Sequence, residues 1–259
     1  MIRMRSLLCL SLLLGSFSGA HAQDWWPLPW DGNLLFGVSG GYAERLDNVD
    51  ITLAYTSPGN TIPSSFLIED YTDTGYLGGF FVGAQVWIDR VLIGAEFSVD
   101  WDELDRKHFF GFSDANGQVR LNGLGYSAMA RYERDVTYAL SARFGYEITP
   151  CFMPYARVGV AKSRDTLTVA FAGDPAIYNF GVITQGDAEQ IRYLLGLGFE
   201  VPVPYLPFIG LRAEYNYQSR AKNTEALGGI NDNLGFNPFF MNKMNPRTQI
   251  AKISAVWNI

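Results

Sequence analysis

The sequence predicts an all-β protein: a transmembrane eight-stranded antiparallel up-and-down β-barrel, preceded by a cleaved signal peptide. Three observations support this class: apolar residues that alternate with small or charged ones, connections that alternate between short and long, and a charge-balanced polar face. The alternation is clearest in VLIGAEFSVDWD, residues 91–102, where the odd positions are apolar and the even ones mostly small or acidic. A period of two is the pattern of a β-strand, whose successive side chains point to opposite faces.

The first 22 residues have the features of a secretory signal peptide. Arg3 and Arg5 precede an apolar run that ends at Leu14, and Ala20-His21-Ala22 offers a small-residue cleavage site. We therefore expect cleavage after Ala22, which leaves residues 23–259 as a single barrel domain.

The composition of the remaining chain excludes several kinds of protein. Its formal charge is negative, which argues against a nucleic-acid partner. Cys151 is the single cysteine after residue 22, so neither an internal disulfide nor a cysteine-based metal cluster is expected, and no cofactor is indicated. No later stretch has the roughly 18 apolar residues of a membrane-spanning helix.

Eight segments carry the two-residue period, and the connections between them alternate in length. The segments are 34–44, 76–87, 91–102, 136–148, 155–163, 190–201, 208–218 and 248–259. Short connections fall at 88–90, 149–154 and 202–207, and long ones at 45–74, 103–134, 164–189 and 219–247. This asymmetry is typical of outer-membrane barrels, so we expect four extracellular loops and two periplasmic termini. Ten strands remain possible if 164–189 adds a hairpin within the membrane.

Alternation alone does not say which face meets lipid, but the polar face does. It is rich in Gly, Ala and Ser, which suit the narrow interior of an eight-stranded barrel better than a solvated surface. Its charges nearly balance, as an interior requires, because a lone buried charge is costly. We expect an interior charge network of Glu96, Asp100, Arg143, Glu147, Arg157, Arg192, Glu200, Arg212, Glu214 and Lys252. The apolar face then meets lipid, in preference to the reverse arrangement of a soluble lipocalin-like barrel.

With its signal peptide, eight strands, four long loops and terminal KISAVWNI, the chain resembles the small outer-membrane barrels, such as the transmembrane domain of outer membrane protein A and the opacity-type surface proteins. The resemblance implies that the barrel-assembly machinery reads the last strand, here through Ile253, Ala255, Trp257 and Ile259. Such proteins usually end in an aromatic residue. This chain instead ends in Ile259, with Trp257 two residues earlier.

We expect a surface protein with a structural and adhesin-like interaction role, exercised through its four long loops. A candidate contact surface is Phe236, Phe239, Phe240 and Met241, where aromatic and Met side chains favour a protein interface. The alternative for the loop aromatics is packing across hairpins that extend the strands above the membrane, and the two roles can coexist. The alternative is a small porin-like pore for ions or small solutes along the interior charges. An enzyme is not expected, because His108 and the nearby Ser113 lack an identifiable group to orient them as a catalytic pair.

Overall fold

The computed structural model describes residues 31–57, 60–105, 107–111, 126–173, 181–229 and 237–259, and the expected signal peptide lies outside these ranges. Among the described residues, no helix is long and apolar enough to cross a membrane. The strands are β1 (Asp31–Ser57), β2 (Asn60–Ile88), β3 (Val91–Asp102), β4 (Lys107–Gly111), β5 (Tyr126–Arg134), β6 (Thr137–Tyr146), β7 (Met153–Gly173), β8 (Gly181–Val203), β9 (Leu206–Gln218), β10 (Thr224–Gly229), β11 (Asn237–Met244) and β12 (Arg247–Asn258).

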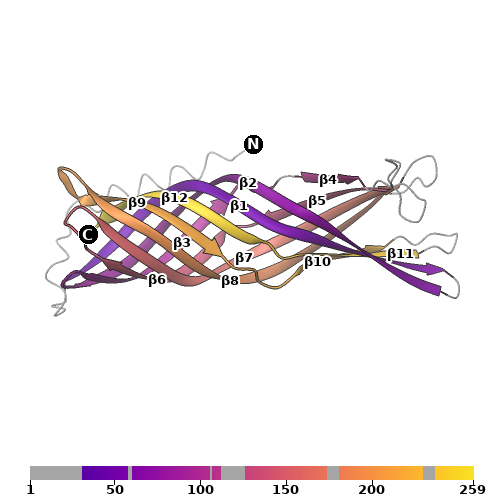
Figure 1. Ribbon diagram of the computed structural model, residues 1–259, viewed down its shortest axis with the longest axis horizontal. Helices are drawn as coiled ribbons and strands as arrows, with labels where there is room; N and C mark the ends of the chain where they lie inside the picture. The colour runs from indigo at the N-terminus through magenta and orange to yellow at the C-terminus, as the bar shows by residue number, and fades with distance from the viewer. Residues whose placement is uncertain (1–30, 58–59, 106, 112–125, 174–180, 230–236) are drawn as a thin grey trace, which may run out of the picture.

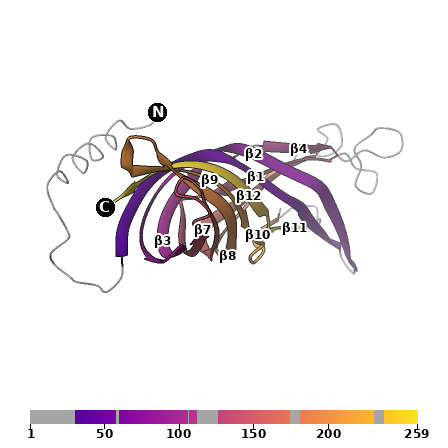
Figure 2. The ribbon, with the colours of Figure 1, turned by 60° about the vertical axis from the view of Figure 1, so that its left-hand side comes forward.

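Eight of these strands close into a barrel (Figures 1 and 2). Every neighbouring pair is antiparallel, in the order β1-β2-β3-β6-β7-β8-β9-β12 and back to β1. The partners of Tyr42, followed once around the ring, lead back to β1 at Gly32, ten residues earlier. The strands are therefore strongly tilted, and an eight-stranded ring of this kind has an interior just wide enough for side chains to fill.

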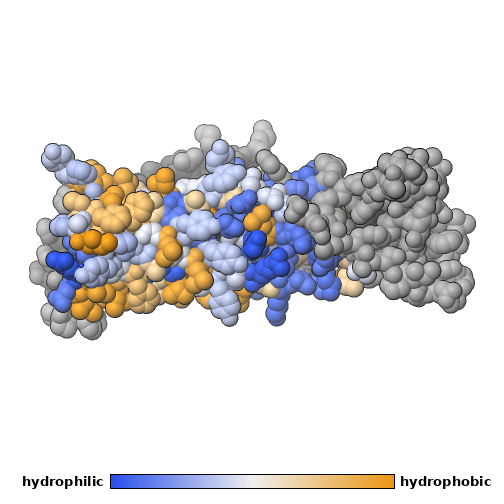
Figure 3. All heavy atoms as spheres, viewed as in Figure 1, coloured by the Kyte–Doolittle hydropathy of each residue, from blue (hydrophilic) through white to orange (hydrophobic). Residues whose placement is uncertain are grey.

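The predicted orientation of the two faces is confirmed. Along β3 the odd positions are mostly exposed and the even positions mostly buried, so Phe97 points outward and Glu96 inward. Figure 3 shows hydrophobic residues gathered on the part of the wall nearest the short turns. Aromatic side chains border this belt on its far side, as interfacial girdles do in membrane barrels. They include Tyr42, Tyr76, Trp101, Tyr138 and Tyr193.

The short turns and both ends of the described chain lie together at one end of the barrel. Asp89 and Tyr205 adopt positive φ angles of 54° and 67° in the turns that join β2 to β3 and β8 to β9. The backbone amide of Ile259 donates to Leu34 O at 2.8 Å, which joins the C-terminus to the start of β1.

The ranges 45–74 and 164–189, predicted as long connections, consist largely of strands that extend those of the barrel. β1 and β2 stay paired as far as Ser57 and Asn60, and β7 and β8 as far as Ala172 and Gly181. The ranges 103–134 and 219–247 likewise contain β4, β5, β10 and β11. The barrel still has eight strands, because the hairpin in 164–189 extends two existing strands instead of adding new ones.

The strand extensions build an outer lobe beyond the apolar belt. Its inward-facing side chains are partly polar, as at Thr184 and Asn242, and partly apolar. Val49, Ala130, Leu167, Val169 and Met244 are almost fully buried there. β10 and β11 also approach β7 across the interior. The lobe is therefore packed around a small apolar core of its own.

Four strands run unbroken from the barrel into the outer lobe, whereas the other four wall positions change strand at the lobe's base. β1, β2, β7 and β8 are continuous, while β3 gives way to β4, β6 to β5, β9 to β10 and β12 to β11. The wall also changes at a seam. β2 pairs with β3 up to Leu77, but β4 pairs with β5 and not with the described part of β2.

Candidate functional site

The barrel interior holds a charge network, and its lower tier is a four-membered cluster. Arg212 contacts Glu96 and Glu200, with a shortest distance of 2.7 Å to each carboxylate. Arg143 lies 3.0 Å from Glu200 and 3.5 Å from Glu96. All four side chains are buried and come from β3, β6, β8 and β9, so the cluster ties together strands from different parts of the wall.

Two further ion pairs continue this lower tier. Arg157 lies 3.0 Å from Glu214, and Lys252 lies 2.6 Å from Asp100. Tyr155 donates its hydroxyl hydrogen to Glu214 at 2.9 Å. These contacts satisfy buried charges that would otherwise be costly to remove from water.

Aromatic rings line the guanidinium groups of the lower cluster. The Arg143 guanidinium carbon is 4.9 Å from the ring centre of Tyr155, and that of Arg212 is 5.0 Å from the ring centre of Phe81. Cations over aromatic faces are stabilised further where water is excluded. The interior is therefore filled by charged groups and rings packed together.

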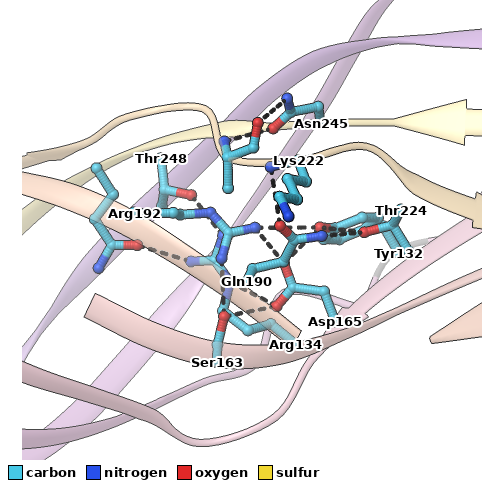
Figure 4. Close-up of polar contacts among 12 residues, drawn as sticks. Tyr132, Arg134, Ser163, Asp165, Gln190, Arg192, Lys222, Thr224, Asn245 and Thr248 are labelled. Carbon is cyan, nitrogen blue, oxygen red and sulfur yellow. Dashed lines mark hydrogen bonds and ion pairs between the residues drawn. The ribbon is translucent and has the colours of Figure 1, made fainter. Parts of the chain in front are cut away.

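An upper tier lies at the base of the outer lobe, around Asp165 (Figure 4). This carboxylate accepts hydrogen bonds from Tyr132 at 2.5 Å, from Ser163 at 2.7 Å and from Arg192. Arg134 lies 3.5 Å from Asp165 and also donates to Gln218 at 3.0 Å and to Thr248 at 3.1 Å. The tier therefore ties β5, β7 and β8 to β9 and β12 where strands change.

Arg45 fastens the seam between β2 and β4 from the inside. Its Nη1 donates to Leu104 O at 3.0 Å and to Tyr132 O at 3.1 Å, and its Nη2 lies 3.3 Å from Asp102. The chain after β3 passes close to β2 at Gly75, where an added Cβ would lie 3.0 Å from Glu103 O. Side chains and a close backbone crossing thus hold a part of the wall that lacks a strand ladder.

Burial and charge shift the pKa values of groups in the outer lobe. Burial alone would raise the pKa of Asp165, but Arg134 and Arg192, with the hydrogen bonds to this carboxylate, lower it below its usual value. Burial, and then the charge of Asp73, raise the pKa of Tyr71 to about 12. At neutral pH Asp165 is therefore ionised and Tyr71 is neutral.

Nine of the ten side chains expected in the network point into the barrel and form ion pairs, and eight of them pair with one another. Glu147 is the exception: it is half-buried at the short-turn rim and forms no ion pair with another described residue. Arg192 pairs with Asp165, which the sequence reading placed in a loop. That reading missed Arg45, Asp73, Asp102, Tyr132, Arg134 and Asp165. The two-residue period, continued past the predicted strand ends at 44, 76 and 163, reaches Arg45, Asp73 and Asp165 on the inward side.

The remaining predicted residues lie at the two ends of the molecule. Phe236 is outside the described residues, whereas Phe239, Phe240 and Met241 belong to β11, which pairs with β1 and β10. Ile253, Ala255, Trp257 and Ile259 lie on or directly after β12, and Trp257 stacks on Phe36 with ring centres 5.1 Å apart.

His108 and Cys151, the candidate reactive residues that the structure describes, lie at opposite ends of the molecule. The ring of His108 packs on Tyr71 with centres 4.1 Å apart, and Ser113 lies outside the described residues. Cys151 is exposed in the turn between β6 and β7.

A closed ring of eight antiparallel strands, apolar outside and ion-paired inside, is the architecture of a bacterial outer-membrane β-barrel. No protein-family model matches the chain, and no curated protein matches it. Its fold is similar to those of several solved outer-membrane proteins. OprG from Pseudomonas aeruginosa is 13% identical, with a TM-score of 0.47 over 86% of this chain and 95% of that chain.

Two other solved structures are more distant. The outer membrane protease OmpT from Escherichia coli is 10% identical, with a TM-score of 0.42 over 88% of this chain and 97% of that chain. Ail, the attachment invasion locus protein of Yersinia pestis, is 12% identical, with a TM-score of 0.30 over 83% of this chain and 97% of that chain. At these values the similarities carry no conclusion about function, and the fold assignment rests on the strand pairing itself.

Proposed function

We propose that this is a non-conducting surface protein of the outer membrane, whose outer lobe serves as a rigid platform for contact with an external partner. The observation that carries the proposal is the ion-paired interior around Arg143 and Arg212. An ion entering the lower tier would have to break contacts between buried groups, and separating such pairs leaves uncompensated charge. The apolar core of the outer lobe is a second barrier on the same path.

The platform is the part of the molecule that reaches beyond the apolar belt. Its walls are paired strands, so it loses little conformational entropy when a partner binds. In this proposal the lobe faces the outside of the cell and both termini face the periplasm after removal of residues 1–22. Phe236, Phe239, Phe240 and Met241 are the candidate contact residues. The β12 positions Ile253, Ala255, Trp257 and Ile259 would be read during barrel assembly.

Single-channel conductance in a planar bilayer tests the first half of the proposal. The refolded protein is compared with the Arg143→Ala/Arg212→Ala double variant, and heat-modifiable gel migration shows that each is folded. A silent bilayer with the wild-type barrel is the expected result. Discrete openings of the wild type, enlarged in the double variant, would overturn the proposal and support a small pore.

Cell adhesion tests the second half. Bacteria that display the wild-type protein are expected to adhere to matrix-coated wells better than cells with a Phe239→Ser/Phe240→Ser variant displayed in equal amount. Met129→Ser, in β5 on another part of the lobe, is the matched control. Adhesion no better than that of cells without the protein would overturn the adhesin-like role while leaving the sealed barrel intact.

A further inference from the structure

The outer wall across β6, β7, β8 and β9 carries a groove within the lipid-facing belt. Its volume is about 360 Å³, and its lining is almost wholly apolar. The floor lies at Ala156, whose paired neighbours on either side are the larger Phe144 and Leu197. Leu195, Tyr215 and Tyr217 continue the wall of the groove. A small residue between large ones on a tilted sheet thus leaves an apolar hollow on the outer face.

A second hollow of about 370 Å³ lies on the same face, at the level where the apolar belt gives way to charge. Tyr138 and Val136 supply its apolar side, and its polar side consists of Asp135, Lys162, Ser163, Arg164 and Glu189. Lys162 lies 2.9 Å from Glu189, and Arg164 lies 2.8 Å from Asp187. Lys162 and Arg164 occupy successive outward positions of β7, so two cations point from one strand toward the edge of the lipid.

Outward-facing apolar side chains of β7 and β8 lie between the two hollows. Val160 lies between Val158 of the groove and Lys162 of the upper hollow, and Tyr193 spans the same interval on β8. The four steps along the strand from Val158 to Lys162 cover about 13 Å at the usual rise of a strand. This distance suits a molecule whose charged head and hydrocarbon chain lie end to end.

We propose that this face binds a phosphorylated glycolipid of the outer leaflet, with an acyl chain in the groove and its phosphorylated sugar in the upper hollow. Lys162 and Arg164 would donate to the phosphate, and Glu189 and Asp187 would accept hydrogen bonds from sugar hydroxyls. Arg and Lys are the usual donors to phosphate, and their charged hydrogen bonds are the stronger kind.

The existing ion pairs do not oppose this assignment. Lys162 and Arg164 are more than half exposed, and exposed ion pairs contribute little, so they can exchange partners at small cost. A ligand that carries both phosphate and hydroxyl groups complements a surface on which both signs alternate. A phospholipid with a simple anionic headgroup would leave the carboxylates unmatched.

The test measures lipid retention. The mature barrel is placed in nanodiscs that contain phosphatidylethanolamine and a minor fraction of bisphosphorylated, acylated glucosamine disaccharide, released into detergent, and analysed by native mass spectrometry. Phosphatidylglycerol replaces the glycolipid in a second set of nanodiscs, and the dephosphorylated disaccharide in a third. We expect one retained glycolipid, with clearly less retention of the other two lipids.

Two variants and two matched controls assign the site. Lys162→Gln/Arg164→Gln should weaken glycolipid binding about tenfold or more, the scale of one charge-assisted contact. Ala156→Phe, which fills the groove, should also reduce retention. Lys243→Gln, in an outward ion pair with Glu225 on another part of the wall, and Ala84→Phe, on the outer face of β2, should retain the glycolipid as the wild type does.

Equal retention of phosphatidylglycerol and glycolipid by the wild type would overturn the proposal. So would unchanged glycolipid binding in the Lys162→Gln/Arg164→Gln variant, because the headgroup would then lie elsewhere. Heat-modifiable migration of each variant shows that the barrel is folded, so that lost binding is not lost structure.

Discussion

Arg45 and Tyr132 meet inside the barrel although 87 residues separate them, and Nη1 of the arginine donates to the tyrosine carbonyl oxygen at 3.1 Å. The same guanidinium contacts Leu104 O and the carboxylate of Asp102. One side chain from β1 therefore joins β3, the chain that follows it, and β5. The contact lies where β4 and the described part of β2 form no strand-to-strand hydrogen bonds. This seam therefore depends on the Arg45 side chain for its stability.

Arg45→Ala should therefore destabilise the folded protein strongly. Removing one partner of a buried ion pair leaves an uncompensated charge, which costs about 3–5 kcal/mol. Arg131→Ala is the matched control, because Arg131 pairs with Asp105 and Glu133 on the surface and such pairs contribute about 0–1 kcal/mol. Urea unfolding of the refolded barrels measures both changes. Equal losses in the two variants would contradict the role assigned to Arg45.

The pair formed by Lys252 and Asp100 should show strong coupling in a double-mutant cycle. Each single change to Ala leaves the other buried charge without its partner, whereas the double change removes both charges together. We expect the double variant to lose less stability than the sum of the single losses, by about 1–3 kcal/mol. Additive losses in urea unfolding would mean that the 2.6 Å contact contributes no coupling free energy.

Asp165 should make the outer lobe sensitive to acid. Its pKa is lowered in the folded protein, so its stabilising effect is complete above the ordinary Asp pKa near 3.9 and is lost as the pH falls through the lowered value. Asp165→Asn should be less stable than the wild type at pH 7, and the difference should shrink below about pH 4. Tryptophan fluorescence during urea unfolding at several pH values gives the comparison. A difference that stays constant down to pH 2 would contradict the proposed linkage.

Gly186 marks the close approach of β10 to β8. An added Cβ would collide with the backbone oxygen of Glu225, so Gly186→Ala should displace β10 and open the lobe to protease. Gly40→Ala is the matched control, because no atom lies within 4 Å of a Cβ built at this outward position. Limited proteolysis followed by mass spectrometry should show new cleavage in residues 219–229 of the first variant only. An unchanged pattern in both variants would show that β10 adapts without leaving β8.

The barrel could be predicted from sequence because the bilayer imposes a strict rule on each strand. Within the belt, Phe97 must face lipid and Glu96 must face the interior, so the two-residue period is clear. The charge network followed from the same rule, because charges on the inner face of a narrow ring have to find one another. Only their pairing needed the structure, since register and tilt decide that Arg212 meets Glu96, 116 residues away.

The outer lobe was missed because the pattern reverses beyond the membrane. On β7, Val158 and Val160 face outward, whereas Leu167 and Val169 face inward and Thr166 and Thr168 lie on the outer side. Where a strand passes from lipid into water, its outward residues change from apolar to polar, and some of its inward residues change from polar to apolar. A pattern that requires apolar residues on the outward face therefore predicts that the strand ends at the edge of the bilayer. For the same reason, the sequence pattern predicts that Asp165 lies in a loop.

The four uninterrupted strands determine how the outer lobe would resist a pulling force. A pull on the tip near Ser57 and Asn60 would load β1 and β2 lengthwise, so many backbone hydrogen bonds would share the load in shear. The wall positions that change strand at the lobe's base have no such continuous path and would yield first. A force applied to the tip of the outer lobe would thus be transmitted along β1 and β2 to the eight-stranded ring.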